Sequence, residues 1–447
     1  MEDRIGNTTK SHAAHIAPTR RPRGWEQRMR GDFTHPARHH KTSGTTSAPH
    51  LKVIPPKNES TPAPEIEDVG CPPCHRGLLM CLIIILGLSI PIVFSASTAI
   101  ALDNHSGPTF FLWRQIIFVL IGFAAMIGIS RMQRNRVQKL GWILYGITVV
   151  GLIATKWSPL GHSLGGVERW IKLGPVLFQV SELGKIALLV VLANYWSKFA
   201  NESHGHSYKG ILPWLVSGGL LTLPLVLLVM MQPHLSAALV LFSLFLIVPF
   251  FAGVPGWQYA KIFGGVIVFA FVVGNLATSH RMPVLKPYQQ DRIAHFFSQD
   301  KNDQTAYYQT AQGLRAIERG GWIGVGPGNS LYKQGHLPAP HTDFILAVTG
   351  EDWGVLGMLV LLTLYSLLIF FCLQVGHAAT NTFEMLVATG MGLLLFIQVF
   401  GNMCVVLGMM PVTGMPLPFI SYGGSGLVCL LMGMGMVLGI SRHQTEA

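Results

Sequence analysis

Long apolar runs recur along this chain, and they constrain its fold more than any other feature of the sequence. Residues 78–94 are LLMCLIIILGLSIPIVF, and residues 265–277 are GVIVFAFVVGNLA. Half of the 447 residues are hydrophobic and only 12% are charged, whereas roughly a quarter of a soluble protein is charged. The sequence therefore predicts a polytopic membrane protein and argues against a soluble enzyme with buried helices.

Ten apolar segments can be delimited, several of them near or below the ~20 residues that a helix needs to cross a bilayer. They cover approximately residues 77–98, 113–130, 138–155, 181–197, 211–231, 235–254, 259–276, 344–374, 384–408 and 419–440. The predicted fold is all-α, an integral membrane protein with ten transmembrane helices. A large outer loop, 277–342, connects helices 7 and 8, and its glycines and polar motifs favour a function for it.

Basic residues in the short connections orient these helices. Residues 131–139, RMQRNRVQK, carry four Lys and Arg, and residues 99–112 carry none. Cytoplasmic loops are enriched in Lys and Arg, so both termini are predicted to be cytoplasmic. The predicted organisation is a tail at 1–76, a membrane domain at 77–443 and a short cytoplasmic end at 444–447.

The net charge of +11 does not by itself indicate nucleic-acid binding. Twelve of the 32 Lys and Arg lie in residues 1–76, which are rich in Pro, Thr, Ser and His and lack apolar periodicity. This composition favours a disordered cytoplasmic extension over a nucleic-acid-binding arm. No signal peptide is expected, because the first long apolar run starts near residue 77 and continues as a spanning segment.

One cysteine motif in the tail needs an interpretation. CPPCH, at 71–75, matches the C-x-x-C-H pattern of c-type haem attachment. Haem is attached on the outer side of the membrane, whereas this segment is predicted to be inside. A lone C-x-x-C also lacks the second ligand pair of a structural zinc site. The motif is interpreted as incidental, with metal or lipid attachment as the alternative.

Polar clusters stand at the starts of four predicted helices. They are FQVSELGK (178–185), MQPHLSAA (231–238), HTDF (341–344) and PFISYGGSG (418–426). Every even-numbered helix begins on the outer side in the predicted topology. All four clusters should therefore lie at one membrane face and form one site that opens outward.

Single residues of these clusters have structural as well as functional interpretations. Glu182 and Lys185 are spaced i, i+3 and can pair; function is favoured because ionisable groups are costly in a membrane. His234 could equally be a packing residue at a helix start. Gly423 and Gly424 either allow helices to approach closely or belong to a loop whose backbone N–H groups meet a polar ligand.

Asp343 lies at a predicted helix start beside the long polar loop. It could cap the helix or complement its dipole, or it could take a proton from a hydroxyl as a general base. The residues alone leave both interpretations open. Glu351 and Asp352 lie roughly two turns deeper at ~1.5 Å per residue, so internal pairing or packing is expected for them.

Longer motifs resemble a known family. Residues 308–357 and 402–427, with FQVSELGK and MQPHLSAALV, are similar to the SEDS family (shape, elongation, division and sporulation), which includes FtsW, RodA and SpoVE. GNSLYK followed by LPAPHTDF is closest to the FtsW and SpoVE branch. The resemblance covers about residues 77–443. It implies a membrane glycosyltransferase that polymerises lipid II into peptidoglycan strands during cell division or sporulation.

The resemblance also implies roles for individual residues. Asp343 falls on the family's essential aspartate, thought to act as general base on the acceptor sugar hydroxyl. Substrate binding is implied for residues of the same motifs and of GGVERWIKLG (165–174), which falls on the family's Arg-Trp-Ile segment: Arg169, Glu182, Lys185, Gln232, Asn329, Ser330, Lys333, His341, Thr342, Ser421, Gly423 and Gly424. Cations should meet the lipid diphosphate. The candidates are Arg169, Lys172, Arg292 and Lys333.

The chain departs from the family's pattern at a few positions. Val180 replaces the proline of F-Q-P-S-E, and His234 and Ser236 replace the Asp and Gly of Q-P-D-L-G-T. The loss of that carboxylate puts any cation-binding role there in doubt. A divalent cation such as Mg²⁺ or Mn²⁺ could assist the leaving diphosphate, but no metal-ligand spacing in the sequence demands one.

The resemblance implies partners and a location as well. These are lipid II, a class B penicillin-binding protein and other divisome proteins at the septum of a bacterial plasma membrane, without nucleic acid. Two alternatives stay open: a flippase for lipid-linked oligosaccharides and a non-catalytic division scaffold. The inner helix ends are comparatively bland and no convincing repeat is present, which disfavours a transporter.

Overall fold

The computed structural model describes most of the membrane domain and none of the basic tail up to residue 73. The described residues are 74–103, 107–159, 161–164, 167–174, 176–202, 212–261, 264, 306–333, 337, 340–412 and 414–446. Seven described helices are long and apolar enough to cross a membrane, and two more apolar helices are shorter. The helical membrane fold predicted from the sequence is therefore confirmed.

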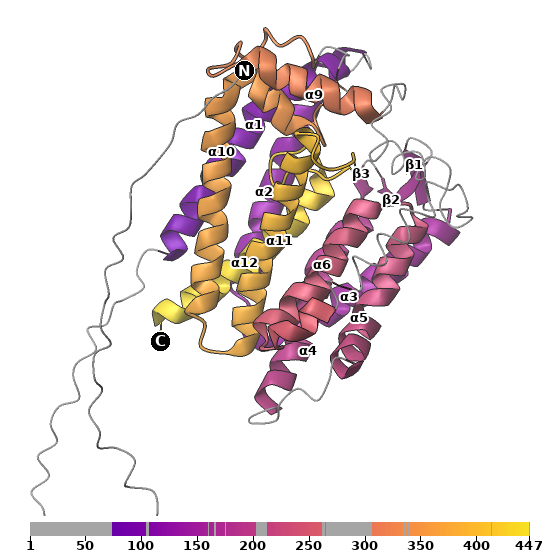
Figure 1. Cartoon of the computed structure of the whole chain (residues 1–447), viewed down its shortest axis with the longest axis vertical. Helices are drawn as coiled ribbons and strands as arrows, with labels where there is room; N and C mark the ends of the chain where they lie inside the picture. The colour runs from indigo at the N-terminus through magenta and orange to yellow at the C-terminus, as the bar shows by residue number, and fades with distance from the viewer. Residues whose placement is uncertain are drawn as a thin grey trace, which may run out of the picture. The chain divides into compact units, whose positions relative to one another are not determined.

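Nine of the ten predicted apolar segments correspond to described helices. The main helices are α1 (Cys74–Asp103), α2 (Phe110–Ser130), α3 (Arg134–Trp157), α4 (Val180–Glu202), α5 (Leu212–Met231), α6 (Leu235–Phe251), α9 (Ala306–Gly320), α10 (Ile345–His377), α11 (Thr382–Val406) and α12 (Gly424–Glu446). The predicted seventh segment, 259–276, lies mostly outside the described residues, so the number ten stays a prediction. Figure 1 shows α10 running beside α11 and α1, with which it is in contact.

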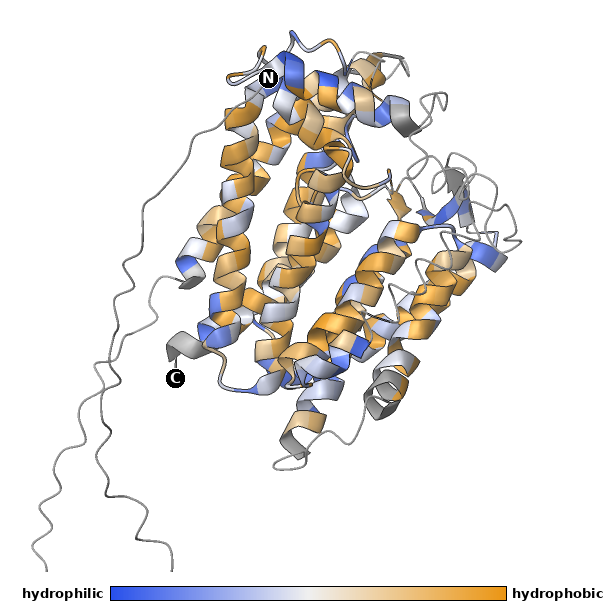
Figure 2. Cartoon of the chain, in the orientation of Figure 1, coloured by the Kyte–Doolittle hydropathy of each residue, from blue (hydrophilic) through white to orange (hydrophobic). Residues whose placement is uncertain are grey.

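The outer faces of the helices carry large apolar side chains. Leu220 is 74% exposed, Val150 67% and Met80 64%, and Figure 2 shows hydrophobic residues along most of the helices. Faces of this kind are stable against lipid but not against water. The exposed apolar surface therefore identifies a protein that is embedded in a membrane.

Small residues let α2 and α12 pack closely. A Cβ atom on Gly435 would lie 2.5 Å from the carbonyl oxygen of Met126, and one on Gly439 would lie 2.9 Å from that of Ser130. Glycines spaced four apart on one helix are typical of such close membrane packing. The later half of α12 is thereby packed closely against the end of α2.

A small antiparallel sheet connects α3 to α4, which the all-α prediction did not include. Its strands are β1 (Gly161–Leu164), β2 (Val167–Leu173) and β3 (Val176–Phe178), in the order β1-β2-β3. Figure 2 shows that β2 is more hydrophilic than the adjoining helices. Strands this short carry little sequence signal, but β2 places Arg169 and Trp170 at the functional cavity described below.

The loop after α9 is joined to a break in α10. Gly354, with φ 73° and ψ −175°, is not helical. Residues 321–326 bridge this break with four backbone hydrogen bonds: Val325 N–H to Glu351 O (3.0 Å), Gly326 N–H to Asp352 O (3.0 Å), Val355 N–H to Gly321 O (2.9 Å) and Leu356 N–H to Trp322 O (3.1 Å). The loop thus satisfies polar groups that the broken helix leaves unpaired.

Candidate functional site

The four polar clusters line one cavity of about 270 Å³. The starts of α4, α6, α10 and α12 contribute, in order, Gln179 and Glu182, His234, Thr342 and Asp343, and Ser421 and Gly423. The structure thus brings together the segments that the sequence analysis grouped by topology. Arg169 and Trp170 of β2 and Gln398 of α11 also line the cavity.

The backbone around Asp343 is held by α11 and by the segment that precedes α12. The Asn402 side-chain amide donates to the carbonyl oxygens of Asp343 (2.8 Å) and Met415 (2.7 Å). Ser421 Oγ donates to the carbonyl oxygen of Thr342 at 2.7 Å. These bonds fix the turn that carries Asp343 against α11 and the segment before α12, so its position does not depend on α10 alone.

The Asp343 side chain lines the cavity and does not cap α10. The N-cap of α10 is Phe344, and the first turn of the helix has no acidic residue. The capping interpretation of Asp343 is therefore wrong. A Cβ atom added to Gly414, where φ is +73°, would lie 3.4 Å from Asp343 Oδ2, an ordinary van der Waals contact, so Gly414 lies directly beside the carboxylate.

Glu182 and Lys185 form a buried ion pair beside this cavity. Lys185 Nζ lies 2.7 Å from Glu182 Oε2, and the two side chains are 4% and 7% exposed. The predicted i, i+3 pairing is confirmed. Lys185 lines a narrow recess that shares Glu182, His234 and Gln398 with the main cavity.

Arg169 reaches the cavity from β2 and is supported by the turn before α6. Its Nε donates to the carbonyl oxygen of Gln232 at 3.3 Å, and its guanidinium also donates to that of Pro233. Gln232 donates its side-chain amide to Leu152 O at 3.2 Å and does not line the cavity. Gln232, expected at the substrate, therefore acts on the site through Arg169.

Lys333 and Ser330, expected at the substrate, instead lie in a buried network. Lys333 Nζ is 3.2 Å from Asp352 Oδ1 and 2.8 Å from Ser95 Oγ. Ser330 Oγ donates to the same carboxylate. A buried carboxylate requires a cation or hydrogen-bond donors, and these groups supply both. Neither residue lines the cavity, which corrects their expected placement.

Glu351 pairs internally, as predicted for it and for Asp352. Its Oε1 accepts from the backbone N–H groups of Leu331 (2.8 Å) and Tyr332 (3.3 Å) and from Arg319 Nη1 (3.4 Å). Glu351 is fully buried. The carboxylate therefore holds the loop before α10 in place, together with α9.

His341 and Gly424 pack beside the cavity but are not among the residues that line it. The His341 ring centroid lies 5.4 Å from that of Phe111 and 5.8 Å from that of Tyr422. Burial lowers the pKa of His341 to about 4, so the ring is neutral at pH 7. A Cβ atom on Gly424 would lie within 2.4 Å of the Phe118 ring, so this glycine serves the contact with α2.

Three more predicted residues lie away from the cavity or outside the described chain. Asn329 is exposed, and its amide donates to Val325 O at 3.0 Å within its own loop. Lys172 is exposed on β2 and does not line the cavity. Arg292 lies outside the described residues. Of the three cations expected at a diphosphate that the structure describes, Arg169 is the one that lines the main cavity.

Two cavity residues carried no functional assignment from the sequence. Gln398 is 2% exposed, and its only sequence signal is a single amide within the apolar run LLLFIQVFG at 393–401. For His234 the sequence left both a packing role and a functional role open. Burial lowers its pKa to about 3, and the nearby charges of Arg169 and Lys185 act in the same direction.

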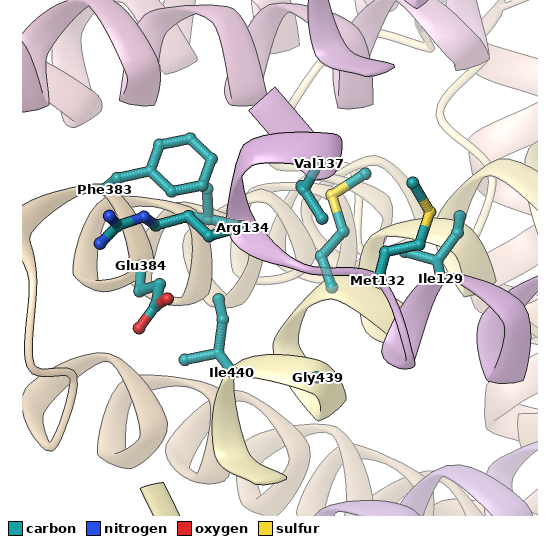
Figure 3. A pocket seen from close by; sticks show the side chains of 10 residues that line it. Ile129, Met132, Arg134, Val137, Phe383, Glu384, Gly439 and Ile440 are labelled. Carbon is teal, nitrogen blue, oxygen red and sulfur yellow. The ribbon is translucent and has the colours of Figure 1, made fainter. Parts of the chain in front are cut away.

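A smaller hollow lies at the opposite ends of the helices, between the start of α3, the start of α11 and the end of α12. Figure 3 shows the Arg134 and Glu384 side chains at this hollow, beside Phe383. Its volume of about 20 Å³ is enough for a water molecule, which needs at least about 10–15 Å³. It cannot hold a sugar.

A metal-ligand cluster is not found in the described part of the chain: no three His, Cys, Asp or Glu side chains are grouped closely enough to hold an ion. At the cavity, Glu182 is already paired with Lys185. His234 is neutral and has cations beside it. Glu182 and His234 therefore do not fit a divalent cation.

Comparison with known proteins gives relatives along nearly the whole chain. A "Probable peptidoglycan glycosyltransferase FtsW" of Nitrosomonas europaea is 34% identical over 403 residues, covering 89% of this chain and 96% of the relative. A protein of the same description from Thioalkalivibrio sulfidiphilus is 32% identical over 375 residues, covering 83% and 90%.

Solved structures also match most of this chain. A chain from work titled "Structural coordination of polymerization and crosslinking by a peptidoglycan synthase complex" matches with a TM-score of 0.67 and 29% identity, covering 83% of this chain and 98% of that one. The rod shape determining protein RodA of Thermus thermophilus matches with a TM-score of 0.58 and 28% identity, covering 82% and 96%. The family model described as "Cell cycle protein" matches residues 76–446. The chain belongs to the FtsW/RodA/SpoVE family of membrane proteins.

Proposed function

We propose that this protein is a peptidoglycan glycosyltransferase that polymerises lipid II, with Asp343 as the general base. The observation that carries the proposal is a carboxylate on a fixed turn, lining a cavity at which four polar helix starts meet. The relatives described as peptidoglycan glycosyltransferases provide the substrate class.

The chemistry follows from the placement of the carboxylate. A hydroxyl of the acceptor sugar attacks the anomeric carbon of the donor sugar, and the bond from that carbon to the lipid diphosphate breaks. Asp343 accepts the hydroxyl proton as the new glycosidic bond forms, and the diphosphate leaves with the bonding electron pair. General-base assistance of this kind contributes typically ~10²–10⁴ in rate.

Arg169 is the residue best placed to meet the diphosphate. Two backbone carbonyl groups already orient its guanidinium at the cavity, so little conformational entropy is lost when it binds an anion. Lys185 is paired with Glu182 and therefore adds little net charge. Loss of Arg169 should weaken binding of the lipid substrate more than it changes the proton transfer.

Orientation and partners are part of the same proposal. The cavity faces the outer side of a bacterial plasma membrane, with both termini in the cytoplasm, and the protein works at the division septum. A class B penicillin-binding protein and other divisome proteins are its partners. The solved neighbour from a synthase complex that coordinates polymerization with crosslinking supports such a pairing.

A flippase is the main rival, and the two hollows weigh against it. A transporter needs a polar path to both membrane faces. The described residues instead form one cavity of about 270 Å³ at one end and a hollow of about 20 Å³ at the other. This asymmetry suits an enzyme that acts at a single face.

The deciding experiment is polymerisation of purified lipid II in detergent, where no membrane remains to be crossed. The wild-type protein, with its penicillin-binding partner added, should form glycan strands. Asp343→Asn should lower the rate ~10²–10⁴-fold with an unchanged thermal unfolding temperature. Glu318→Gln, the same change of carboxylate to amide at an exposed residue of α9, is the control and should keep the wild-type rate.

Each contrary outcome has a definite meaning. If Asp343→Asn polymerises at the wild-type rate, Asp343 is not the base. If the wild-type protein forms no product even with its partner, the enzyme proposal fails and the flippase or scaffold alternative gains.

A further inference from the structure

Two uncharged side chains that line the cavity, Gln398 and His234, carry hydrogen-bond donors that have no role in the proposed reaction so far. Both side chains are deeply buried. Gln398 is 2% exposed and His234 is 5% exposed. Both line the main cavity and the recess beside Lys185. Groups this buried normally have hydrogen-bond partners, so an unpaired donor here requires an explanation.

Gln398 has an unused donor. Among the described residues, no group hydrogen-bonds to its side-chain nitrogen Nε2. Leaving a buried polar atom unpaired costs about 1–3 kcal/mol. Because this atom belongs to a residue that lines a cavity, a ligand in the cavity can supply the missing acceptor.

His234 supplies a second donor. Its Nδ1 lies 3.4 Å from the side-chain nitrogen of Gln179 and 3.4 Å from Ser181 Oγ. An amide nitrogen only donates, so Nδ1 is the acceptor, and the proton of the neutral ring is on Nε2. No partner for Nε2 is found within the described part of the chain.

The net charge around Gln398 and His234 indicates what kind of ligand group can bind there. Lys185 and Glu182 cancel, and the two free donors are uncharged. An anionic phosphate would gain little here and would lie near the Glu182 carboxylate. An uncharged acceptor fits better, and an amide carbonyl is a stronger acceptor than a hydroxyl.

We infer that Gln398 and His234 form a subsite for the acylamino carbonyl oxygen of one sugar of the substrate, where the main cavity adjoins the recess beside Lys185. The cavity volume of about 270 Å³ is close to the ~300 Å³ lower limit of small-molecule sites, which suits a single sugar ring. This subsite rests on the proposed function, because that function makes a lipid-linked sugar the ligand.

The test compares two substrates in a binding assay without turnover. The probes are lipid II and an analogue in which the sugar acetamido groups are replaced by hydroxyls. Dissociation constants are measured with the full chain in detergent, in an Asp343→Asn background. The parent protein should bind the analogue more weakly by roughly 3- to 30-fold, as expected for one or two lost hydrogen bonds.

Gln398→Met removes the donor and keeps the side-chain volume. It should weaken binding of lipid II by roughly 3- to 10-fold and change binding of the analogue by less than about twofold, because the analogue lacks the acceptor. Gln115→Met is the matched control: Gln115 is also fully buried with unpaired amide atoms but does not line the cavity. It should change neither dissociation constant.

The outcomes separate the two proposals. If Gln398→Met lowers the affinity for both probes equally, or does not lower the affinity for lipid II, the proposed subsite is overturned. If Gln398→Met does not fold, equal affinity of the parent protein for the two probes overturns it without any variant. A wild-type protein that selects between the probes but makes no polymer overturns the proposed function and leaves the subsite in place.

Discussion

Two buried lysine–carboxylate pairs in the described membrane domain share their chemistry but differ in their surroundings. Lys185 and Glu182 are 2.7 Å apart on one turn of α4 and line the cavity and its recess. Lys333 and Asp352 are 3.2 Å apart, join a loop to α10 and line no part of the cavity. In the second pair, Lys333 also donates a hydrogen bond to Ser95, and Asp352 accepts one from Ser330.

The difference shows that burial and pairing do not identify a functional charge. When an ion pair borders a cavity, either charged group can instead bind a ligand. If one of the two residues is replaced, water in the cavity can solvate the remaining charge. A pair enclosed by protein has no such relief, so it serves to fix the loop. We therefore expect the Lys185–Glu182 pair to control activity and the Lys333–Asp352 pair to control folding.

The largest effect on stability is expected from Lys333→Met. It leaves the Asp352 carboxylate buried without its cation, which should lower the free energy of unfolding by about 3–5 kcal/mol. Denaturant unfolding of the protein in detergent measures the loss. The double variant Lys333→Met/Asp352→Leu should recover most of it, because no unpaired charge remains. A loss below about 1 kcal/mol in the single variant would show that this pair is solvated.

The cavity pair should behave differently. Removing either charge, as Glu182→Gln or Lys185→Met, should lower the polymerisation rate roughly tenfold or more, since breaking a buried charge pair costs about 2 kcal/mol or more. The exchange Glu182→Lys/Lys185→Glu restores pairing and should retain more activity than either single variant. Similar losses in all three would exclude simple pairing as the role of these residues.

Gly354→Ala tests the loop that the Lys333–Asp352 pair fixes. A Cβ atom there would lie 2.4 Å from Trp322 O, at a φ of +73° that suits glycine. Backbone strain of this kind costs about 1–3 kcal/mol, to be measured as a lower unfolding free energy. Gly87→Ala in α1 is the control, because a Cβ atom there meets nothing within 4 Å. Equal effects would mean that the loop does not need the break in α10.

The smallest effect concerns pH. His234 lies beside Arg169 and Lys185 and has a pKa of about 3, against 6.5 unfolded. Below pH 6.5 the unfolded chain binds a proton that the folded chain does not, so stability falls as the pH falls. The loss from this residue should reach about 1 kcal/mol between pH 7 and pH 5.5. His234→Asn should flatten that part of the pH profile; an unchanged profile would mean that His234 does not contribute.

Local patterns in the sequence already determined much of this protein. Apolar runs of helical length predicted the spans, because each span satisfies its own backbone in lipid. The i, i+3 spacing predicted the Glu182–Lys185 pair, and the topology placed four helix starts at one face. The family motifs 308–357 and 402–427 identified Asp343 as the candidate base.

Only the tertiary structure decided how distant segments meet. It paired Lys333 with Asp352 and with Ser95, which is 238 positions away in the chain, and so removed Lys333 from the cavity. In the folded chain Gln398, a lone amide in an apolar run, lines the cavity. The loop at 321–326 hydrogen-bonds across the break in α10. Periodicity and spacing report neighbours along one helix, whereas these partners are chosen by packing between elements far apart in sequence.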